Sequence, residues 1–163
     1  MDGTAECEGR YDMAQRNPNA AAAGFSEQER AAMKARAKEL KAEAGGGRGA
    51  KKAAADEAAV LSEIAAMTPA DAALASRVHE IVTTEAPELA PKTWYGQPAY
   101  ARDGKVLCFF RGGDVDKERY ATLGFTTEAR LDDGGLWPTS FAVTDMSEAT
   151  RTAIGELVRR AVG

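Results

Sequence analysis

The sequence has few of the residues that catalysis and disulfide scaffolds require. Its 163 residues include one histidine, His79, and two cysteines, Cys7 and Cys108. Cys7 lies in a polar segment and Cys108 in an apolar run, a pattern that does not suggest a disulfide framework. No Ser/His/Asp or Cys/His arrangement can be assigned around the single histidine. We therefore expect a protein that is not an enzyme, with His79 at the boundary of the core and Cys108 within it.

Long hydrophobic runs are also missing. No apolar run approaches the roughly 20 residues that a membrane-spanning helix needs. The first residues, MDGTAECEGR, are acidic where a secretory signal is basic. We expect a cytoplasmic protein in a reducing compartment, without a membrane partner.

Positive charge is scarce except in one segment. The 21 basic and 25 acidic residues give a net charge of -4, which argues against wrapping nucleic acid over the whole surface. Residues 26–55 hold eight Lys or Arg and four Glu, a net +4, whereas residues 56–163 hold eleven and seventeen, a net -6. Because the basic segment interleaves glutamates and lacks aromatic residues for base stacking, a solvated face is favoured over nucleic-acid binding. Pairing with a protein partner through Met33 and Leu40 is the alternative.

The chain divides into three parts. Residues 1–24 have almost no large apolar side chain, so we expect a disordered tail. Residues 25–58 form an extension rich in Ala, Lys and Glu, with a glycine hinge at 45–49. Ser26 and Glu29 predict a capping box that opens a helix over 26–44, which has too thin an apolar stripe to dock firmly. Residues 59–163 should form the folded domain.

Periodicity in the rest of the chain predicts two helices, then strands, then a last helix. The helices span 51–67, with Val60, Leu61, Ile64 and Met67 on one face, and 69–85, with Leu74, Val78, Ile81 and Val82 on one face. Asp103-Gly104 predicts a hairpin that pairs Tyr100 with Leu107 and Pro98 with Phe109, and places Tyr100, Leu107 and Phe109 on one face. Further strands are expected at 119–125 and 140–143. Asp145 and Glu148 predict a capping box for a helix that ends near residue 161.

These elements predict an α+β fold, in which an antiparallel meander packs with a helix before it and a C-terminal helix after it. The run Trp94-Tyr95-Gly96-Gln97-Pro98-Ala99-Tyr100, with Ala86-Pro87 before it and Asp103-Gly104-Lys105 and Phe109-Phe110 after it, resembles the YdhG-like domain of unknown function. That family belongs to the YjbR/CyaY-like group, which includes frataxin-like proteins. The resemblance covers roughly residues 60–163 and implies the same α+β arrangement, with an iron-related role among the functions proposed within the group.

Aromatic residues near this motif suggest a ligand site. On strands such residues are most often core, but a half-open pocket is the alternative, since Tyr and Trp have polar tips that need partners. Gly96 and Pro98 would fix a bend that exposes backbone groups at the rim. The candidate ligand-binding residues are Trp94, Tyr95, Gly96, Pro98, Tyr100 and Trp137.

Acidic residues in two loops suggest a weak metal site. Carboxylates are hard ligands that suit iron or another divalent ion, although acidic loops are more often simply solvated. The candidates are Asp114, Asp116 and Glu118 in one loop and Asp132 and Asp133 in the other.

Two functions follow from these observations. The first is a non-catalytic binding domain that takes a small ligand or a metal ion near the Trp94–Tyr100 bend or the acidic loops. The second is an interaction module whose basic N-terminal helices recruit a protein or nucleic acid. Deleting the basic extension would separate them, because only the second function requires it.

Overall fold

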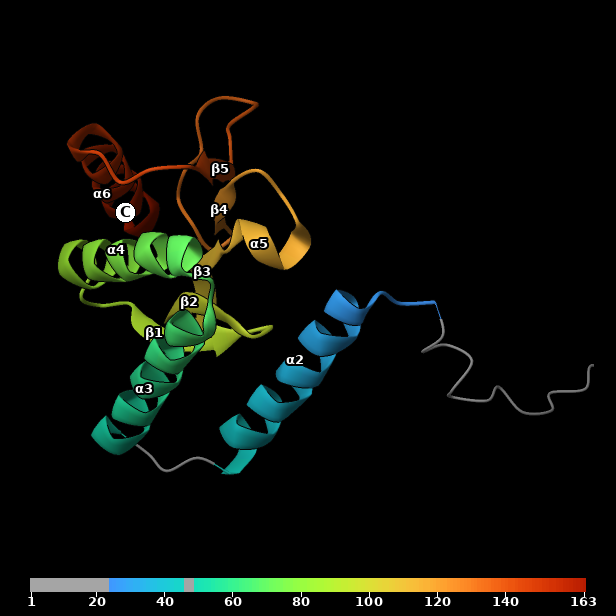
Figure 1. Ribbon diagram of the computed structural model, residues 1–163. Coiled ribbons are helices and arrows are strands. Elements are labelled where there is room, and N and C mark those ends of the chain that lie inside the picture. Colours follow the sequence, from blue (N-terminus) through green and yellow to red (C-terminus); the bar gives the residue numbers. More distant parts are fainter. Residues whose placement is uncertain (1–23, 46–48) are drawn as a thin grey trace, which may run out of the picture.

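The computed structural model describes residues 24–45 and 49–163, so the predicted tail and most of the predicted hinge lie outside the described residues. Three helices, α2 (Glu27–Gly45), α3 (Ala50–Ala66) and α4 (Pro69–Glu85), precede a sheet, and α6 (Glu148–Val162) follows it (Figure 1). The strands are β1 (Ala90–Trp94), β2 (Gln97–Arg102), β3 (Lys105–Arg111), β4 (Ala121–Phe125) and β5 (Ser140–Val143), with the short helix α5 (Gly113–Asp116) between β3 and β4. The predicted α+β class is confirmed.

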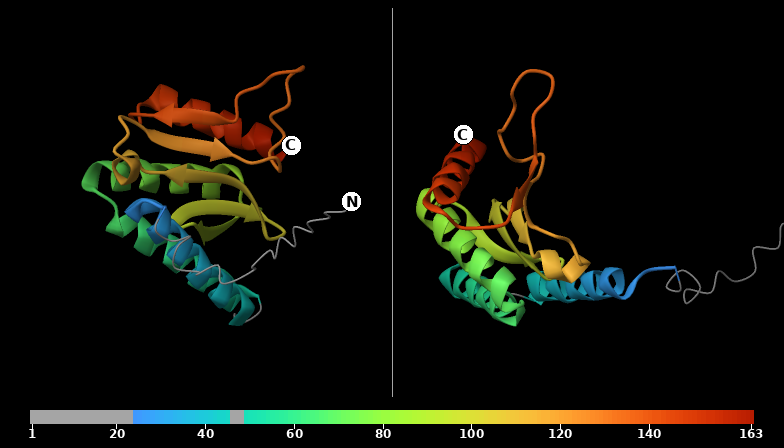
Figure 2. Two further views of the ribbon diagram at one scale, coloured as in Figure 1. Left: turned by 90° about the vertical axis from the view of Figure 1, so that its right-hand side faces the viewer. Right: turned by 45° about the horizontal axis from the view of Figure 1, so that its top comes forward.

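The sheet is a meander in which every strand is antiparallel to the next along the chain, in the order β1-β2-β3-β4-β5. Two-residue turns join the first three strands, Tyr95-Gly96 after β1 and Asp103-Gly104 after β2. All four of these residues have positive φ, as a type I′ hairpin turn requires. The loop between β4 and β5 projects from the sheet and carries Leu136, which is 90% exposed (Figure 2).

The predicted register of the β2–β3 hairpin is wrong beyond its first pairs. Arg102 lies opposite Lys105, as expected, but the register shifts between Ala101 and Tyr100, so that Tyr100 pairs with Cys108 and Ala99 with Phe109. Leu107 is the extra residue of this β-bulge, and Leu107 and Cys108 both belong to the core. Phe109 therefore lies on the face opposite Tyr100. Alternation alone could not reveal the bulge, because β3 is apolar on both faces.

The core lies between one face of the sheet and the helices α3, α4 and α6. In the left view of Figure 2 the sheet stands in front of α4 and α6. Tyr100, Cys108, Phe110 and Leu123 from the sheet pack in one cluster with helical residues that include Val60, Ile64, Val78, Val82, Ile154 and Val158. The expectation that Leu61 faces this core is wrong, since its side chain is 49% exposed. The predicted boundary between residues 58 and 59 falls inside α3, whose last turns join the core.

The opposite face of the sheet holds Trp94 and Phe109, whose rings lie 5.3 Å apart. Phe109 extends over Gly124 of the neighbouring strand, where a Cβ atom would collide with the ring. Both aromatic residues are half-buried. The helix α2 contacts β1 at this edge of the molecule, on the side away from α6 (Figure 1).

Local sequence signals at the helix ends are partly confirmed. Ser26 and Glu29 form the predicted capping box, with Glu29 N donating to Ser26 Oγ at 3.1 Å and Ser26 N donating to Glu29 Oε2 at 2.7 Å. The capping box predicted for Asp145 and Glu148 is wrong, because Ser147 is the N-cap and accepts a hydrogen bond from Thr150 N. None of the helices in the described part of the chain has the length and apolar character required to cross a membrane.

Candidate ligand-binding cleft

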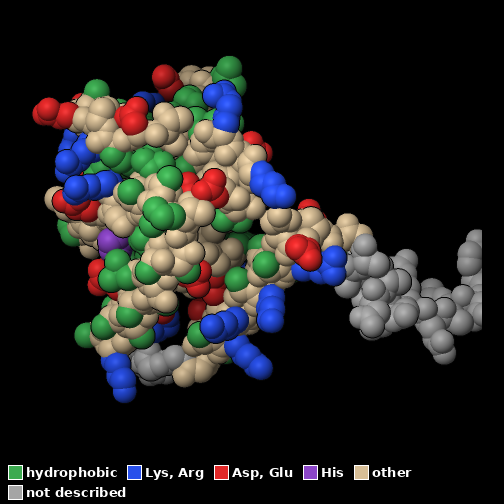
Figure 3. Space-filling model, in the orientation of Figure 1, with side chains coloured by type: hydrophobic (Ala, Val, Ile, Leu, Met, Phe, Trp, Pro, Cys, Tyr) green, Lys and Arg blue, Asp and Glu red, His purple; other side chains and the backbone are tan. Residues whose placement is uncertain are grey.

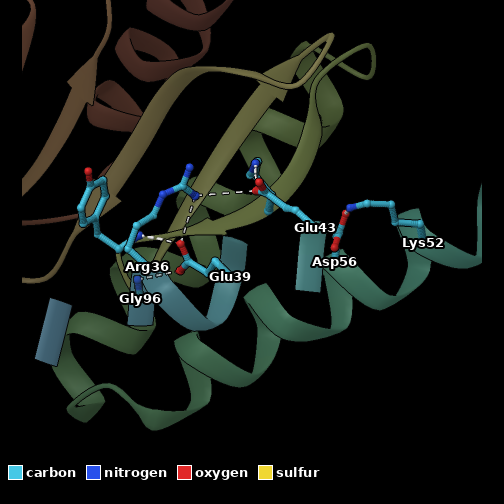
Figure 4. A network of polar contacts seen from close by, with 8 residues as sticks. Arg36, Glu39, Glu43, Lys52, Asp56 and Gly96 are labelled. Carbon is cyan, nitrogen blue, oxygen red and sulfur yellow. Dashed lines mark hydrogen bonds and ion pairs between the residues drawn. The ribbon is translucent and has the colours of Figure 1, made fainter. Parts of the chain in front are cut away.

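One glutamate fixes α2 to the β1–β2 turn. The carboxylate of Glu39 accepts hydrogen bonds from Tyr95 N at 3.0 Å and from Gly96 N at 2.9 Å (Figure 4). Its side chain is only 9% exposed. Both residues of the turn have positive φ, which points their successive N–H groups at one acceptor. Bonds from N–H groups to a carboxylate are stronger than neutral ones, so this pair is the main attachment of α2.

Charged groups around Glu39 add to this attachment. Lys92 Nζ of β1 lies 2.5 Å from Glu43 Oε1, and Arg36 Nη1 lies 3.4 Å from Glu39 and 3.6 Å from Glu43. The hydrogen bond from Lys92 is the largest cause that lowers the pKa of Glu43 below its ordinary value, and the charges of Lys92 and Arg36 act in the same direction. The Arg36 guanidinium also lies over the Tyr95 ring at 5.7 Å. Although α2 buries no residue fully, these polar contacts dock it to the domain.

A cleft of about 340 Å³ lies between α2, the end of α3, the β1–β2 turn and the segment that links β3 to α5. Four separate parts of the chain line it, and α2 provides one whole wall. Most of the lining is apolar, and the residues that provide it are Ala31, Ala32, Ala35, Ala66, Met67 and Val115. An apolar concavity with a few polar groups is the usual form of a small-molecule site.

Gln97 is the most buried of the polar side chains that line this cleft. It is 8% exposed and lines the cleft at the start of β2. Its side-chain amide forms no hydrogen bond with another residue of the described chain. Every fully buried side-chain nitrogen or oxygen atom of the described residues has a hydrogen-bond partner. The unpaired amide of Gln97 must therefore remain partly accessible from the cleft. The accessible amide offers both a donor and an acceptor to a molecule in the cleft.

Two charged groups also line the cleft. The guanidinium of Arg111 is bound through Nε and Nη2 to both carboxylate oxygens of Asp116. This hydrogen bonding raises the pKa of Arg111 above its ordinary value, although partial burial opposes the shift. Arg111 therefore carries a charge that Asp116 balances. Glu63 of α3 is exposed and has no ion-pair partner among the described residues.

Only some of the residues predicted to bind a ligand line the cleft. Tyr95 and Gly96 line the cleft, whereas Trp94 packs edge-on against Tyr95, with ring centroids 5.1 Å apart, and does not line it. Pro98 is fully buried within β2, so the bend is at Tyr95-Gly96 and not at Pro98. Trp137 packs on the core from the β4–β5 loop.

Tyr100 lies on the core face of the sheet, away from the cleft. Its hydroxyl shares a hydrogen bond of 3.1 Å with His79 Nδ1, and His79 Nε2 lies 3.6 Å from Glu57 Oε1. Tyr100 is fully buried, and burial raises its pKa above the ordinary value. His79 lies at the boundary of the core, as expected from its place beside an apolar stripe. The polar tip of Tyr100 is therefore satisfied inside the protein.

Cys108 is buried in the core and forms no disulfide. Burial raises the pKa of its thiol to about 12, so the thiol stays protonated at neutral pH. A protonated, buried thiol is a poor nucleophile, which agrees with the structural role predicted for this residue.

The acidic loop residues are spread over separate contacts. Asp114 accepts a hydrogen bond of 2.5 Å from Thr68, and Asp116 binds Arg111. Asp132 and Asp133 are exposed in the β4–β5 loop, and Glu118 follows α5. Within residues 24–45 and 49–163, no three His, Cys, Asp or Glu side chains gather as metal ligands would.

Sequence reasoning missed the residues that build the cleft. Glu39 and Gln97 are 58 positions apart in the sequence, and nothing local to either indicates that they meet at one turn. Asp71 was missed in a similar way. It reads as a helix-start residue, yet it is buried and accepts hydrogen bonds from the backbone N–H groups of Gly113 and Asp114. These bonds position α5, and so the Arg111 side of the cleft.

Comparisons with models of protein families, with curated proteins and with solved structures find no match to this chain. Its resemblance to the YdhG-like family stays a prediction. The geometry of the cleft is therefore the basis on which a function is argued.

Proposed function

We propose that this protein is a non-catalytic binding domain that holds a small ligand in the cleft between α2 and the β1–β2 turn. The observation that carries the proposal is the largely apolar cleft of about 340 Å³, with the accessible Gln97 amide inside it. This volume lies near the lower end of the range typical of ligand sites. The cleft also contains two of the residues expected from sequence to bind a ligand, Tyr95 and Gly96.

A small molecule fits the described residues better than a metal ion does. The candidate carboxylates Asp114 and Asp116 already have partners, and Asp132 and Asp133 lie in a different loop. The α+β fold and the Trp94–Tyr100 motif support membership of the YdhG-like family, which we keep as part of the proposal. The buried free thiol of Cys108 supports a cytoplasmic location.

Titration of the isotope-labelled protein with a set of metabolites, while amide chemical shifts are followed, tests this function. We expect localised shifts at Tyr95, Gly96 and Gln97. Ala32→Phe fills the cleft from the α2 wall and should abolish these shifts. Ala37→Phe makes the same change at an exposed position of α2 that does not line the cleft, and should leave them intact. Equal binding by both variants would place the ligand elsewhere, and iron(II) in the same titration tests the metal alternative.

A second function has one observation in its favour. Arg30, Lys34, Lys38 and Lys41 follow one another at spacings that place them on one face of α2, opposite Glu39. None of them forms an ion pair with another described residue, and Figure 3 shows Lys and Arg side chains gathered over α2. Glu29, Glu39 and Glu43 lie on other sides of the helix, whereas Glu27 lies beside Arg30. This face is the one that an interaction module would present to an acidic protein or nucleic acid.

Charge reversal distinguishes this second function from the first. Lys34→Glu combined with Lys38→Glu would abolish capture of an acidic partner, because attraction between exposed charges depends on their sign. The same double variant leaves the cleft lining unchanged, so small-molecule binding should persist. Loss of small-molecule binding in this variant would argue against the cleft as an independent site.

A further inference from the structure

The cleft has features that restrict the chemistry of its ligand. Gln97 is more than nine-tenths buried, yet its side-chain amide finds no hydrogen-bond partner among the described residues. Because no fully buried side-chain nitrogen or oxygen of the described residues lacks a partner, the unpaired amide atoms of Gln97 are accessible from the cleft. The cleft that Gln97 lines is the space from which a partner would come.

We infer that the ligand is an uncharged molecule with an apolar body and a head group that both donates and accepts hydrogen bonds, as a carboxamide does. This inference rests on the proposed function and assigns Gln97 as the residue that recognises the head group. A side-chain amide presents an N–H donor beside a C=O acceptor, and a second amide is its natural complement. The alanines of α2, with Met67 and Val115, surround the apolar body.

The charges around the cleft disfavour an anionic ligand. Among the described residues that line the cleft, Arg111 is the one cation, and the Asp116 carboxylate already occupies its Nε and Nη2 groups. Glu63 adds only a solvent-screened negative charge on the α3 side. A carboxylate ligand would thus lose water on entering a mostly apolar space without gaining an unpaired cation. An uncharged amide loses less on entry and gains two hydrogen bonds.

The charges also account for the choice of an uncharged ligand over a cationic one. Glu63 is exposed, so its attraction for a cation is screened by solvent and is weak. Gln97 is the buried polar group of the cleft. Only its carbonyl could accept a hydrogen bond from an ammonium head group, and its N–H groups would stay unpaired. The buried Gln97 amide, and not the exposed Glu63 carboxylate, therefore sets the preference for an uncharged ligand.

Benzamide, benzoate and benzylamine test this inference, since they share one ring and differ in the head group. The full-length labelled protein is titrated with each, and dissociation constants are taken from the shifts of Tyr95, Gly96 and Gln97. We expect benzamide to bind about tenfold more tightly than either charged probe, which corresponds to the loss of one hydrogen bond in a buried site. Binding of benzoate or benzylamine as tight as that of benzamide overturns the inference, while the proposed function stands.

Matched variants assign the selectivity to Gln97. Gln97→Leu keeps the approximate size of the side chain and removes its polar atoms, so benzamide should bind about tenfold more weakly. Ala37→Leu introduces the same side chain at an exposed position of α2 that does not line the cleft, and should alter benzamide binding less than twofold. Equal weakening by both variants would refute the role of Gln97. If none of the three probes shifts any amide of the cleft at 20 mM (about the limit for such weak binding), both the inference and the proposed function fail.

Discussion

Gly96 and Gly104 occupy the same position in two similar turns, but only one of them meets α2. Each is the second residue of a two-residue hairpin turn, with φ of 72° and 80°, respectively. A Cβ atom added at Gly96 would lie 3.2 Å from the Cβ of Ala35, whereas one added at Gly104 would have nothing within 4 Å. The two sites thus carry equal backbone strain and differ in their contact with the helix.

Gly96→Ala should destabilise the protein more than Gly104→Ala. Alanine at positive φ costs about 1 kcal/mol at either site, because its Cβ crowds the backbone. At Gly96 the added methyl group also pushes Ala35 away, and so weakens the two hydrogen bonds to Glu39. Urea unfolding of both variants measures the difference. Equal losses of unfolding free energy would mean that the close approach of α2 to Gly96 contributes nothing.

At the scale of elements, the side chain of Glu39 provides the main attachment of α2. Glu39→Ala removes the acceptor of the Tyr95 and Gly96 N–H groups and the partner of Arg36. Because these N–H groups bond to a largely buried carboxylate, its loss should cost about 1 to 3 kcal/mol. Hydrogen exchange at the Tyr95 and Gly96 amides should accelerate, together with exchange along α2.

Glu27→Ala is the matched control for this prediction. Glu27 is an exposed glutamate in the first turn of the same helix, and it forms no ion pair within the described residues. Its removal should leave exchange at Tyr95 and Gly96 unchanged. Slow exchange of both amides in Glu39→Ala would show that α2 is held by other contacts.

The elements themselves were largely predictable from sequence, because their signals are local. The Ser26 and Glu29 capping box and the Asp103-Gly104 turn each act within a few residues. The bend expected at Gly96 and Pro98 lies at Tyr95-Gly96 instead, because tyrosine at positive φ is rare and so carries no turn signal. The bulge at Leu107 was missed because an apolar residue fits either face of a strand that is covered on both sides.

The candidate site was less predictable than the fold. Tyr95 and Gly96 were identified from the aromatic motif, but Gln97 lies inside the same motif and gave no signal of its own. Its role depends on burial by α2, and the sequence indicated only weak docking for that helix. Glu39 attaches α2 to the domain, which its thin apolar stripe alone could not do, through hydrogen bonds to residues 56 and 57 positions away. Polar contacts over such separations leave no periodic pattern in the sequence.

For the molecule as a whole, the buried thiol of Cys108 should make the free energy of unfolding decrease at alkaline pH. Its pKa in the folded protein is about 12, raised by burial from an ordinary value of 9.0. Below pH 9 the thiol is protonated in both the folded and the unfolded state, so its contribution to stability is fully present. Above pH 9 the unfolded chain releases a proton that the folded protein retains. The free energy of unfolding should then fall by about 1.4 kcal/mol per pH unit from this group, until pH reaches the folded pKa.

Cys108→Ala isolates this contribution from the lysines and tyrosines that titrate over the same range. The smaller side chain lowers the stability at every pH by a similar amount, because it leaves a small cavity in the core. It also removes the titrating group, so the decline in unfolding free energy between pH 9 and 11 should be shallower than in the unmodified protein. Urea unfolding at pH 8, 9, 10 and 11, with reductant present, gives both curves. Parallel curves would show that the thiol ionises as easily in the folded protein as in the unfolded chain, and would contradict its burial against Tyr100 and Phe110.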